Sequence, residues 1–444
     1  FYLLETTLMR VTQLALIIAT VCSSTAVLAE NTSSATSTKE SKITTSLDAV
    51  TVTATRTEKT ALESKQAVNV ITSADIERNL STSVFDSLIM VPNTSATGGP
   101  RAAGQKFSIR GFSDAEDVLV TVDGAIQTFE KYRMGSFFGD PSLYRSISVK
   151  RGPSTVLHGG GALGGLVQAE LKNASDFLDP DEQAGAKVNL GFNSNNKQKN
   201  GSITAYAKAI EDLDLLLSYS NRDSDDFELS NGETLENSAI ASESFLLKGE
   251  YYLTDAQLLT LSYNQTEDSQ RTEFNTTDEG SWGTVYRTVA QKVTNLGYEF
   301  SPENNDYINL KATLGYSQSH VTESDGSGFL KDFVGLESNY EYNILTFDLL
   351  NTTMLGLHTL TYGLQASNKE RIGEKLSFDC TDYDTSTRSC NAYADVATIA
   401  EMSSQPSGQQ DKVGIYIQDE FTWQALTLTA GVRYEKYDSS ATDK

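Results

Sequence analysis

The chain has 444 residues and carries 59 acidic against 35 basic side chains, a formal net charge of −24 at pH 7. Binding to nucleic acid relies on lysine and arginine to neutralise phosphates, so this balance argues against a nucleic-acid partner. Beyond the N-terminal region, no apolar run reaches the roughly 18 residues that a membrane helix needs. A membrane strand needs only about 9–11 residues with alternate apolar positions, so a membrane protein is not excluded.

The first 29 residues have the pattern of an export signal. Residues 1–8 precede the first methionine and are interpreted as a translated upstream stretch. A short basic region then leads into an apolar run over residues 14–21, and residues 27–29 offer a cleavage site before Glu30. A lipid-anchored start at Cys22 is the alternative, although a bulky residue precedes this cysteine.

Two short segments follow the export signal. Residues 30–47 are mostly serine, threonine, lysine and glutamate, so they are predicted to form a disordered tether. Residues 48–55 then alternate valine or alanine with threonine, which favours a strand. Such a segment on a tether can add to the open sheet edge of another protein. The alternative is the first strand of the next domain, and the pattern alone does not decide between them.

Residues 56–180 are predicted to form a small mixed α/β domain. Residues 67–71 form a short apolar strand, and residues 72–75 fit a capping box that opens a helix. A second short helix over residues 83–90 ends before Pro92. Three further apolar runs end in charged turns. These turns contain Arg110 and Gly111, then Asp123 and Gly124, then Arg151 and Gly152.

A glycine-rich stretch follows the last of these turns. Gly159, Gly161 and Gly164 satisfy the spacing G-x-G-x-x-G of dinucleotide-binding loops, which requires a helix to follow. Here the next residues, Gly165 and then LVQAEL, alternate like a strand. The glycines are therefore predicted to allow a tight turn and close packing instead of binding a nucleotide.

From residue 181 onward the chain is predicted to form an antiparallel transmembrane sheet. Alternating segments recur to the end, and tyrosines lie near their ends, as in an interfacial aromatic girdle. Short connections alternate with long polar ones near residues 225–241, 268–284, 321–336 and 372–411. A soluble sandwich also alternates, but its turns have no reason to sort by length. This layout is typical of an outer-membrane barrel with its long loops outside the cell.

About eleven strands are predicted, with no strand that closes the barrel. An open sheet edge is costly in lipid because its backbone groups stay unpaired. Residues 181–444 are therefore expected to be the first half of a barrel in a longer protein. Cys380 and Cys390, in the last long polar segment, are predicted to form a disulfide in an exported protein. Free thiols are the alternative, and a metal site is disfavoured because no histidine or third cysteine is near.

Two further groups could contact small ligands. His320 lies at the outer end of a predicted strand and could touch a ligand there. The acidic loop with Asp223, Asp225 and Asp226 could hold a divalent cation, or it could be simply solvated, which is the favoured interpretation. The three histidines are too scattered to form a metal site.

The chain resembles the TonB-dependent outer-membrane receptors. The resemblance rests on LDAVTVTATR, IRGF, VLVTVDG, VKRGPSTVLHGGGALGG, YIQDEFTW and GVRYEKY. It implies an N-terminal plug domain inside a barrel of about 22 strands in the bacterial outer membrane. It also implies active import driven by TonB and its inner-membrane complex, with no enzymatic activity and no intrinsic cofactor.

The resemblance assigns roles to named residues. It makes residues 48–55 the TonB box, with Ala49, Val50, Thr51, Val52, Thr53 and Ala54 as the TonB-binding residues. It favours the interpretation that the plug charges Arg110, Asp123 and Arg151 pair with acidic side chains lining the barrel; the alternative is that they are ordinary solvated charges. A charge buried in such an interface must be paired.

Within the family, residues 140–180 most resemble haem and haemoglobin receptors, so the expected ligand is haem or haemoglobin-derived haem. A ferric siderophore is the alternative, and a passive porin or surface adhesin is the alternative from another class. Family members often carry a histidine in a loop of the plug. This chain has Tyr132 and Arg133 in that region. Tyrosine can ligate haem iron, which makes Tyr132 a candidate ligand-binding residue.

Overall fold

The structure is a computed structural model that describes residues 51–52, 59–60, 64, 66–99, 101–131, 134–179, 181–276, 283–327, 330, 334–387, 389–401 and 405–441. The predicted signal peptide, the tether, four of the six TonB-box residues, Tyr132 and Arg133 lie outside the described residues. None of the helices in the described ranges is long and apolar enough to cross a membrane.

The plug domain, residues 66–179, is built on a five-stranded sheet with the order β3-β8-β9-β6-β7. β6 and β9 pair in parallel, and the other neighbours pair antiparallel. The strands are β3 (Ala67–Thr72), β6 (Val118–Val122), β7 (Ala125–Gln127), β8 (Tyr144–Arg151) and β9 (Gly165–Leu171), with β4 (Thr94–Thr97) and β5 (Lys106–Ile109) as a separate pair. The helices are α2 (Ser73–Arg78), α3 (Val84–Ser87), α4 (Thr155–His158), η1 (Ala102–Gly104), η2 (Pro141–Leu143) and η3 (Ala174–Asp176).

Local sequence signals explain the helical turns of this domain. The predicted capping box is confirmed, because the Thr72 side chain accepts from the Asp75 amide while Asp75 accepts from the Thr72 backbone. A second capping box at Ser83 and Asp86 opens α3. α3 ends at Ser87 and is therefore shorter than the predicted helix over residues 83–90.

The plug domain has an apolar core, to which Leu216, Leu246 and Val293 of the barrel sheet also contribute. Ile147, Val149 and Leu171 are fully buried where β8 and β9 pair at the centre of the sheet. Phe107 packs with tilted rings against Phe85 and Phe137, at centroid distances of 4.5 Å and 5.6 Å, which joins β5 to α3 and to the loop after β7. Apolar area of this kind is the main favourable term in folding, so the plug contributes its own stability.

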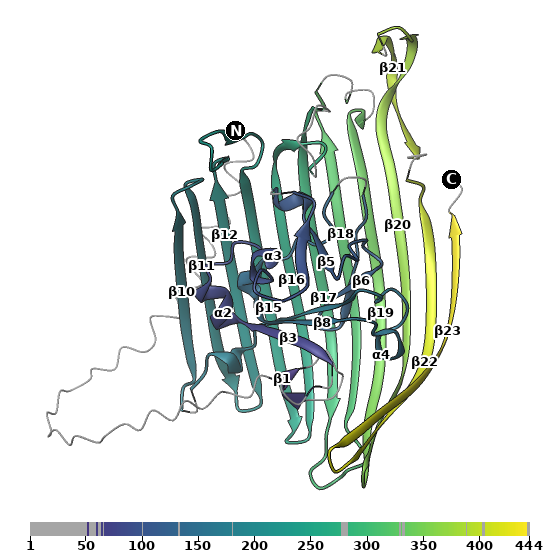
Figure 1. The fold of residues 1–444 in the computed structure, drawn as a ribbon. Coiled ribbons are helices and arrows are strands. Elements are labelled where there is room, and N and C mark those ends of the chain that lie inside the picture. The colour runs from purple at the N-terminus through teal and green to yellow at the C-terminus, as the bar shows by residue number, and fades with distance from the viewer. Residues whose placement is uncertain are drawn as a thin grey trace, which may run out of the picture. The chain divides into compact units, whose positions relative to one another are not determined.

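The barrel sheet, residues 184–441, contains twelve of the described strands (Figure 1). Eleven follow the order β10-β11-β12-β15-β16-β17-β18-β19-β20-β22-β23, each antiparallel to its neighbour, and β21 pairs with the outer part of β20. The strands are β10 (Ala184–Asn193), β11 (Gln198–Ile210), β12 (Leu213–Ser224), β15 (Ile240–Thr254), β16 (Gln257–Glu273), β17 (Thr284–Phe300), β18 (Leu310–Ser324), β19 (Glu337–Leu355), β20 (His358–Asp384), β21 (Ser389–Glu401), β22 (Gly408–Trp423) and β23 (Leu426–Ala441). The predicted plug-and-barrel fold class is confirmed.

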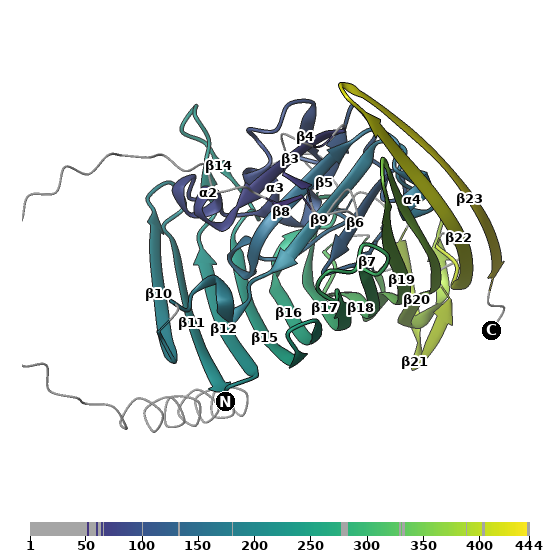
Figure 2. The ribbon, with the colours of Figure 1, turned by 90° about the horizontal axis from the view of Figure 1, so that it is seen from below.

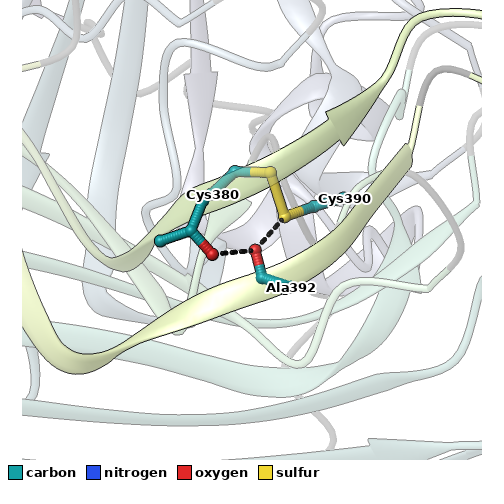
Figure 3. Close-up of a disulfide and its surroundings, with 4 residues drawn as sticks. Cys380, Cys390 and Ala392 are labelled. Atoms are coloured by element: carbon teal, nitrogen blue, oxygen red, sulfur yellow. Dashed lines mark hydrogen bonds between the residues drawn. A yellow bond between two sulfur atoms is a disulfide. The ribbon is translucent and has the colours of Figure 1, made fainter.

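The connections in the barrel sheet mostly follow the predicted alternation of short turns and long loops, with two differences. The connection of residues 301–309 is longer than the predicted short turn. Residues 372–411 were expected to be a long polar loop, but β20 continues to Asp384 and pairs with β21 as a hairpin. Its polar composition hid the strand, although tyrosine, threonine, valine and isoleucine all favour strands. Cys380 and Cys390 join the two strands of this hairpin through a disulfide, with the Cα atoms 5.8 Å apart (Figure 3).

The two faces of the barrel sheet differ in chemistry. Large apolar side chains stay exposed on the face away from the plug. Examples are Leu314, Tyr316, Leu345, Tyr362, Ile415 and Val432. The opposite face carries buried serine, threonine and asparagine, and the plug domain lies against it (Figure 2). A polar lining that faces a plug, with an apolar outer face, fits a membrane barrel.

Candidate functional site

The plug–barrel interface is the candidate functional site, and its centre is the edge strand β7. Asn295 donates through Nδ2 to the Val122 carbonyl at 3.2 Å, and Ser317 donates to the Ile126 carbonyl at 2.7 Å. The Ile126 amide donates to Thr346 Oγ1 at 3.4 Å. Within the described residues, the plug sheet and the barrel sheet share no strand pairing. Single side-chain hydrogen bonds therefore satisfy the plug's open edge, and they can be exchanged for water.

The turn between β6 and β7 adds an ion pair to this edge. Asp123 sits at a φ of 45°, and its Oδ2 accepts from Lys248 Nζ of β15 at 2.8 Å. Its Oδ1 accepts from the Leu171 amide at 2.9 Å, and Lys248 also donates to the Leu171 carbonyl at 3.3 Å. Gly124 follows at a φ of 90°, where a side chain would press against Thr313 of β18. Asp123 thus joins three elements, two of the plug and one of the barrel.

A second buried contact lies at the start of η2. Asp140 accepts from Ser220 Oγ at 2.6 Å and lies 3.4 Å from Arg222, both on β12. Burial opposes ionisation of Asp140, but Arg222 and the hydrogen bonds from Ser220 and Ser142 outweigh it and lower the pKa of this carboxyl. A cavity of about 120 Å³ adjoins this contact, with Phe85 in its lining. The plug is therefore held at this point by an ion pair and a hydrogen bond, next to a cavity.

A third contact, the apical cluster, consists of Lys131, Arg287 and Glu323. Lys131, in the plug loop after β7, lies 3.0 Å from Glu323 Oε1 at the outer end of β18. Arg287 of β17 reaches the same oxygen at 2.7 Å, and all three side chains are almost fully buried. Burial lowers the pKa of Lys131 to about 8, and the attraction of Glu323 only partly offsets that effect. Lys131 also lies 4.5 Å from the ring centroid of Phe274 and 5.0 Å from that of Tyr340.

The glycine-rich turn contacts the last strands of the sheet. The Gly160 amide donates to Glu435 Oε1 at 3.2 Å, and a side chain at Gly159 would press on Arg433 and Glu435. Gly165 lies at a φ of 153°, where a Cβ atom would come within 2.2 Å of the Lys150 carbonyl. The strand predicted after the glycines is β9, so the helix that a dinucleotide site requires is absent from this described segment.

Two of the predicted plug charges contact the plug itself. Arg151 donates to the Pro92 carbonyl at 2.9 Å and to Asn69 Oδ1 at 2.8 Å. Arg110 is exposed at a φ of 55°, beside Gly152 at a φ of 97°. These placements differ from the expected pairing with acidic barrel residues, because β8 and the loop after β5 point these arginines along the plug. Asp123 does contact the barrel, but its partner is a lysine.

Other predicted residues fall into different settings. Gly111, at a φ of 88°, supports the turn after β5, and a side chain at Gly164 would meet Phe112. His320 lies between the buried Ser319 and Val321 on β18. Successive strand side chains point to opposite faces. His320 therefore faces away from the plug, which argues against contact with a ligand held at the plug.

The TonB-box segment and the acidic loop complete the predicted sites. Thr51 and Val52 form β1, which pairs antiparallel with β2 (Lys59–Thr60). In the acidic loop, Asp226 accepts from three backbone amides, those of residues 237–239, and Asp225 pairs with Lys197. The described residues contain no group of three histidine, cysteine, aspartate or glutamate side chains that could hold a metal ion.

Sequence reasoning missed Lys131, Lys248, Arg287 and Glu323. Lys131 lies in the loop already singled out for Tyr132, directly before that residue. The other three are charged residues at positions of β15, β17 and β18 that alternate with the outward row. A charged residue on the buried face of a predicted membrane strand requires a partner, and that signal could have found them.

The family models match both parts of this architecture. The model described as TonB-dependent Receptor Plug Domain matches residues 60–166, and the model described as TonB dependent receptor-like, beta-barrel, matches residues 179–444. The barrel match covers more than half of the chain. The chain therefore belongs to the family of TonB-dependent receptors.

Individual relatives agree with this assignment. The chain is 32% identical over 393 residues to "TonB-dependent heme receptor A" of Haemophilus ducreyi, covering 83% of the chain and 52% of the relative. It is 27% identical over 427 residues to "Hemin receptor" of Yersinia pestis, covering 93% of the chain and 58% of the relative. Among solved structures, the FrpB iron transporter from Neisseria meningitidis (F3-3 variant) has a TM-score of 0.70 at 23% identity, covering 85% of this chain and 60% of that chain. The chain spans about half the length of the curated relatives it matches.

Proposed function

We propose that this protein is an outer-membrane receptor that imports haem, or haem taken from haemoglobin, with energy delivered by TonB. The observation that carries the proposal is the polar, exchangeable contact between plug and barrel around β7 and Asp123. A plug whose core consists mostly of its own apolar side chains can lose these polar contacts without unfolding. The names of the relatives, which are haem and hemin receptors, support haem as the ligand class.

In this proposal each part of the chain has a separate role. Residues 1–29 are upstream residues and a removed export signal, residues 30–47 are the tether, residues 48–55 are the TonB box, residues 56–180 are the plug, and residues 181–444 belong to the barrel. TonB captures residues 49–54 by strand addition and pulls on the plug. Haem is cargo, and the receptor needs no intrinsic cofactor. Outer-membrane lipid contacts the exposed apolar row of the barrel sheet.

Ligand binding must favour one arrangement of plug and box over another. A ligand with equal affinity for both arrangements shifts nothing, however tightly it binds. The outer loops and the loop of residues 128–140 are the proposed contact region, with Tyr132 as a haem-iron ligand and Arg133 beside it. His320 is not included, because it faces away from the plug.

Growth on haem as the only iron source tests the proposal, in cells that lack other haem receptors and express the full-length protein. Deletion of residues 48–55 is expected to abolish growth, whereas deletion of eight tether residues, 34–41, is expected to preserve it. Growth that survives loss of residues 48–55 would indicate a passive pore. Growth on ferric siderophore but not on haem would favour the alternative ligand.

Haem binding by the purified receptor tests the ligand separately. We expect haem to change its absorbance spectrum on binding to the unaltered receptor, and Tyr132→Phe to lose the iron-ligand signature while keeping the aromatic ring. Tyr132→Ala should lose the same signature. An unchanged spectrum in Tyr132→Phe would remove Tyr132 as the iron ligand without removing haem as the cargo.

A further inference from the structure

In the apical cluster, the carboxylate of Glu323 is shared unequally between Lys131 and Arg287. Glu323 Oε1 accepts from both Lys131 of the plug and Arg287 of the barrel, while Glu323 Oε2 is buried with no hydrogen-bond partner among the described residues. Arg287 approaches closely through two nitrogens, Nε at 2.8 Å and Nη2 at 2.7 Å. Lys131 contributes a single contact at 3.0 Å. Charge-assisted pairs with two donors are the stronger and more directional kind.

Arg287 is fixed to the barrel independently of the plug. It donates to the carbonyls of Glu273 at 3.1 Å and Phe274 at 2.8 Å, at the outer end of β16. If Lys131 leaves, Glu323 keeps Arg287 as its partner. Departure of the plug loop therefore leaves no uncompensated charge in the barrel wall, and an uncompensated charge is what makes breaking a buried pair costly.

Lys131 also contacts the apolar cluster from which the outer loops begin. The Phe274 ring lies under its ammonium group, and Phe274 packs with Val285, Leu330 and Val334 in one apolar cluster. These residues belong to the connections β16–β17 and β18–β19 and to the start of β17. Any rearrangement of these loops that moves Phe274 changes the surroundings of Lys131.

We propose that Lys131 is a positioning residue that couples the outer loops to release of the plug. While the Phe274 ring covers it, the Lys131–Glu323 contact holds the plug loop against β18. When that ring moves, Lys131 leaves, and the Arg287–Glu323 pair remains in the wall because Arg287 is held by backbone carbonyls. This inference rests on the proposed import function, since it names the residue through which ligand-driven loop movement would reach the plug. Because Arg287 stays paired with Glu323 when Lys131 leaves, no unpaired charge is left buried in the barrel. The Lys131–Glu323 contact can therefore separate.

Thiol labelling in the full-length receptor, without ligand and without TonB, tests the proposal. Ser319 is buried on the plug-facing side of β18. The thiol of Ser319→Cys therefore lies between this strand and the plug, and its labelling rate reports their separation. Cys380 and Cys390 are joined in a disulfide and do not compete for the reagent. A membrane-impermeant maleimide added from outside should label this probe slowly in the parent. Adding Lys131→Met should raise the rate about tenfold, and Lys131→Arg should restore the slow rate because it keeps the cation.

Thermal unfolding of the same proteins separates positioning from a merely structural role. We expect Lys131→Met to leave the midpoint nearly unchanged, because Glu323 keeps Arg287. Glu323→Gln should lower it clearly, because Lys131 and Arg287 would then face each other without a counter-charge. If Lys131→Met were labelled as slowly as the parent, the proposal would be overturned. It would also be overturned if Lys131→Met lowered the midpoint of thermal unfolding as much as Glu323→Gln does. Neither measurement uses haem or uptake, so failure of the import proposal would be seen separately in the growth test.

Discussion

The plug's core and the plug–barrel interface differ in the balance of forces that holds them, because the core is apolar whereas the interface combines polar contacts with apolar ones such as Phe129 on Tyr342. In the core, Phe107, Ile147 and Leu171 are buried among apolar neighbours. At the interface, Asp123 meets Lys248 and the Ile126 carbonyl meets a serine hydroxyl. Apolar burial is strong and cooperative, whereas each of these polar contacts exchanges protein for water with a small net gain. The comparison indicates that the polar contacts around β7 and Asp123 are the part of the attachment that exchanges most readily for water.

The largest effect is expected from the core. Phe107→Ala removes a ring packed on Phe85 and Phe137 and should destabilise the plug by about 3–5 kcal/mol. Pulse proteolysis of the purified receptor in denaturant measures this loss. Phe112→Ala is the control, because its ring is 42% exposed in the same domain and should cost far less. Equal losses in the two variants would remove the apolar core as the source of the plug's stability.

The Asp123–Lys248 pair should be the next most sensitive point. Lys248→Met leaves a mostly buried carboxylate without its counter-charge, which we expect to weaken plug attachment by about 3 kcal/mol. Protease access to the intact plug at neutral pH would report the change. The double variant Asp123→Asn with Lys248→Met should recover much of it, because the amide oxygen can still accept from Leu171. A double variant as weak as the single one would contradict the electrostatic account.

Lowering the pH should weaken the plug's attachment at Asp140, with an effect between those of Lys248→Met and Ser317→Ala. The pKa of Asp140 is lower in the folded protein than the ordinary value of 3.8. Its contribution is therefore fully present above the unfolded pKa and is lost as the pH falls through the folded pKa. Pepsin cleavage near η2 should accelerate below about pH 4 in the parent, relative to Asp140→Asn, whose dependence should be flatter. Parallel profiles for the two proteins would assign the acid response to other groups.

The smallest effect is expected at the β7 edge. Ser317→Ala removes the donor to the Ile126 carbonyl and should weaken attachment by roughly 1 kcal/mol. Gln318→Ala lies on the opposite face of the same strand and should leave the plug unaffected. The comparison uses protease access to the plug in both variants. A loss in Ser317→Ala as large as that in Lys248→Met would mean that the edge contact is not readily exchanged.

Local sequence signals predicted the elements well but not the pairs between them. The capping box at Thr72 and the alternation of the barrel strands are encoded within a few residues, so both are present in the structure. Asp123 and Lys248 are 125 positions apart, and no local pattern links them. A single sequence identifies a buried charge that needs a partner, but the fold decides which partner it meets.

Two placements differ from the sequence expectation for specific physical reasons. The sequence suggests a ligand contact for His320 because it lies near the outer end of a strand. Contact with the plug depends instead on which face of the strand a side chain occupies, and the buried Ser319 and Val321 define the plug-facing side. The sequence predicts a loop where β20 and β21 form a hairpin, because the segment is rich in polar residues. Backbone pairing there continues beyond the main sheet, with the disulfide between its two strands.

Hydrogen exchange in the full-length receptor tests most directly whether the plug and its attachment are separate units. The Ile147 amide lies in the central ladder of the plug sheet, and the Ile126 amide donates to a barrel side chain. We expect the Ile126 amide to exchange much faster than the Ile147 amide, and Lys248→Met to accelerate Ile126 while leaving Ile147 unchanged. Equal protection of both amides, with both accelerated together by Lys248→Met, would mean that plug and barrel open as one cooperative unit and would contradict this expectation.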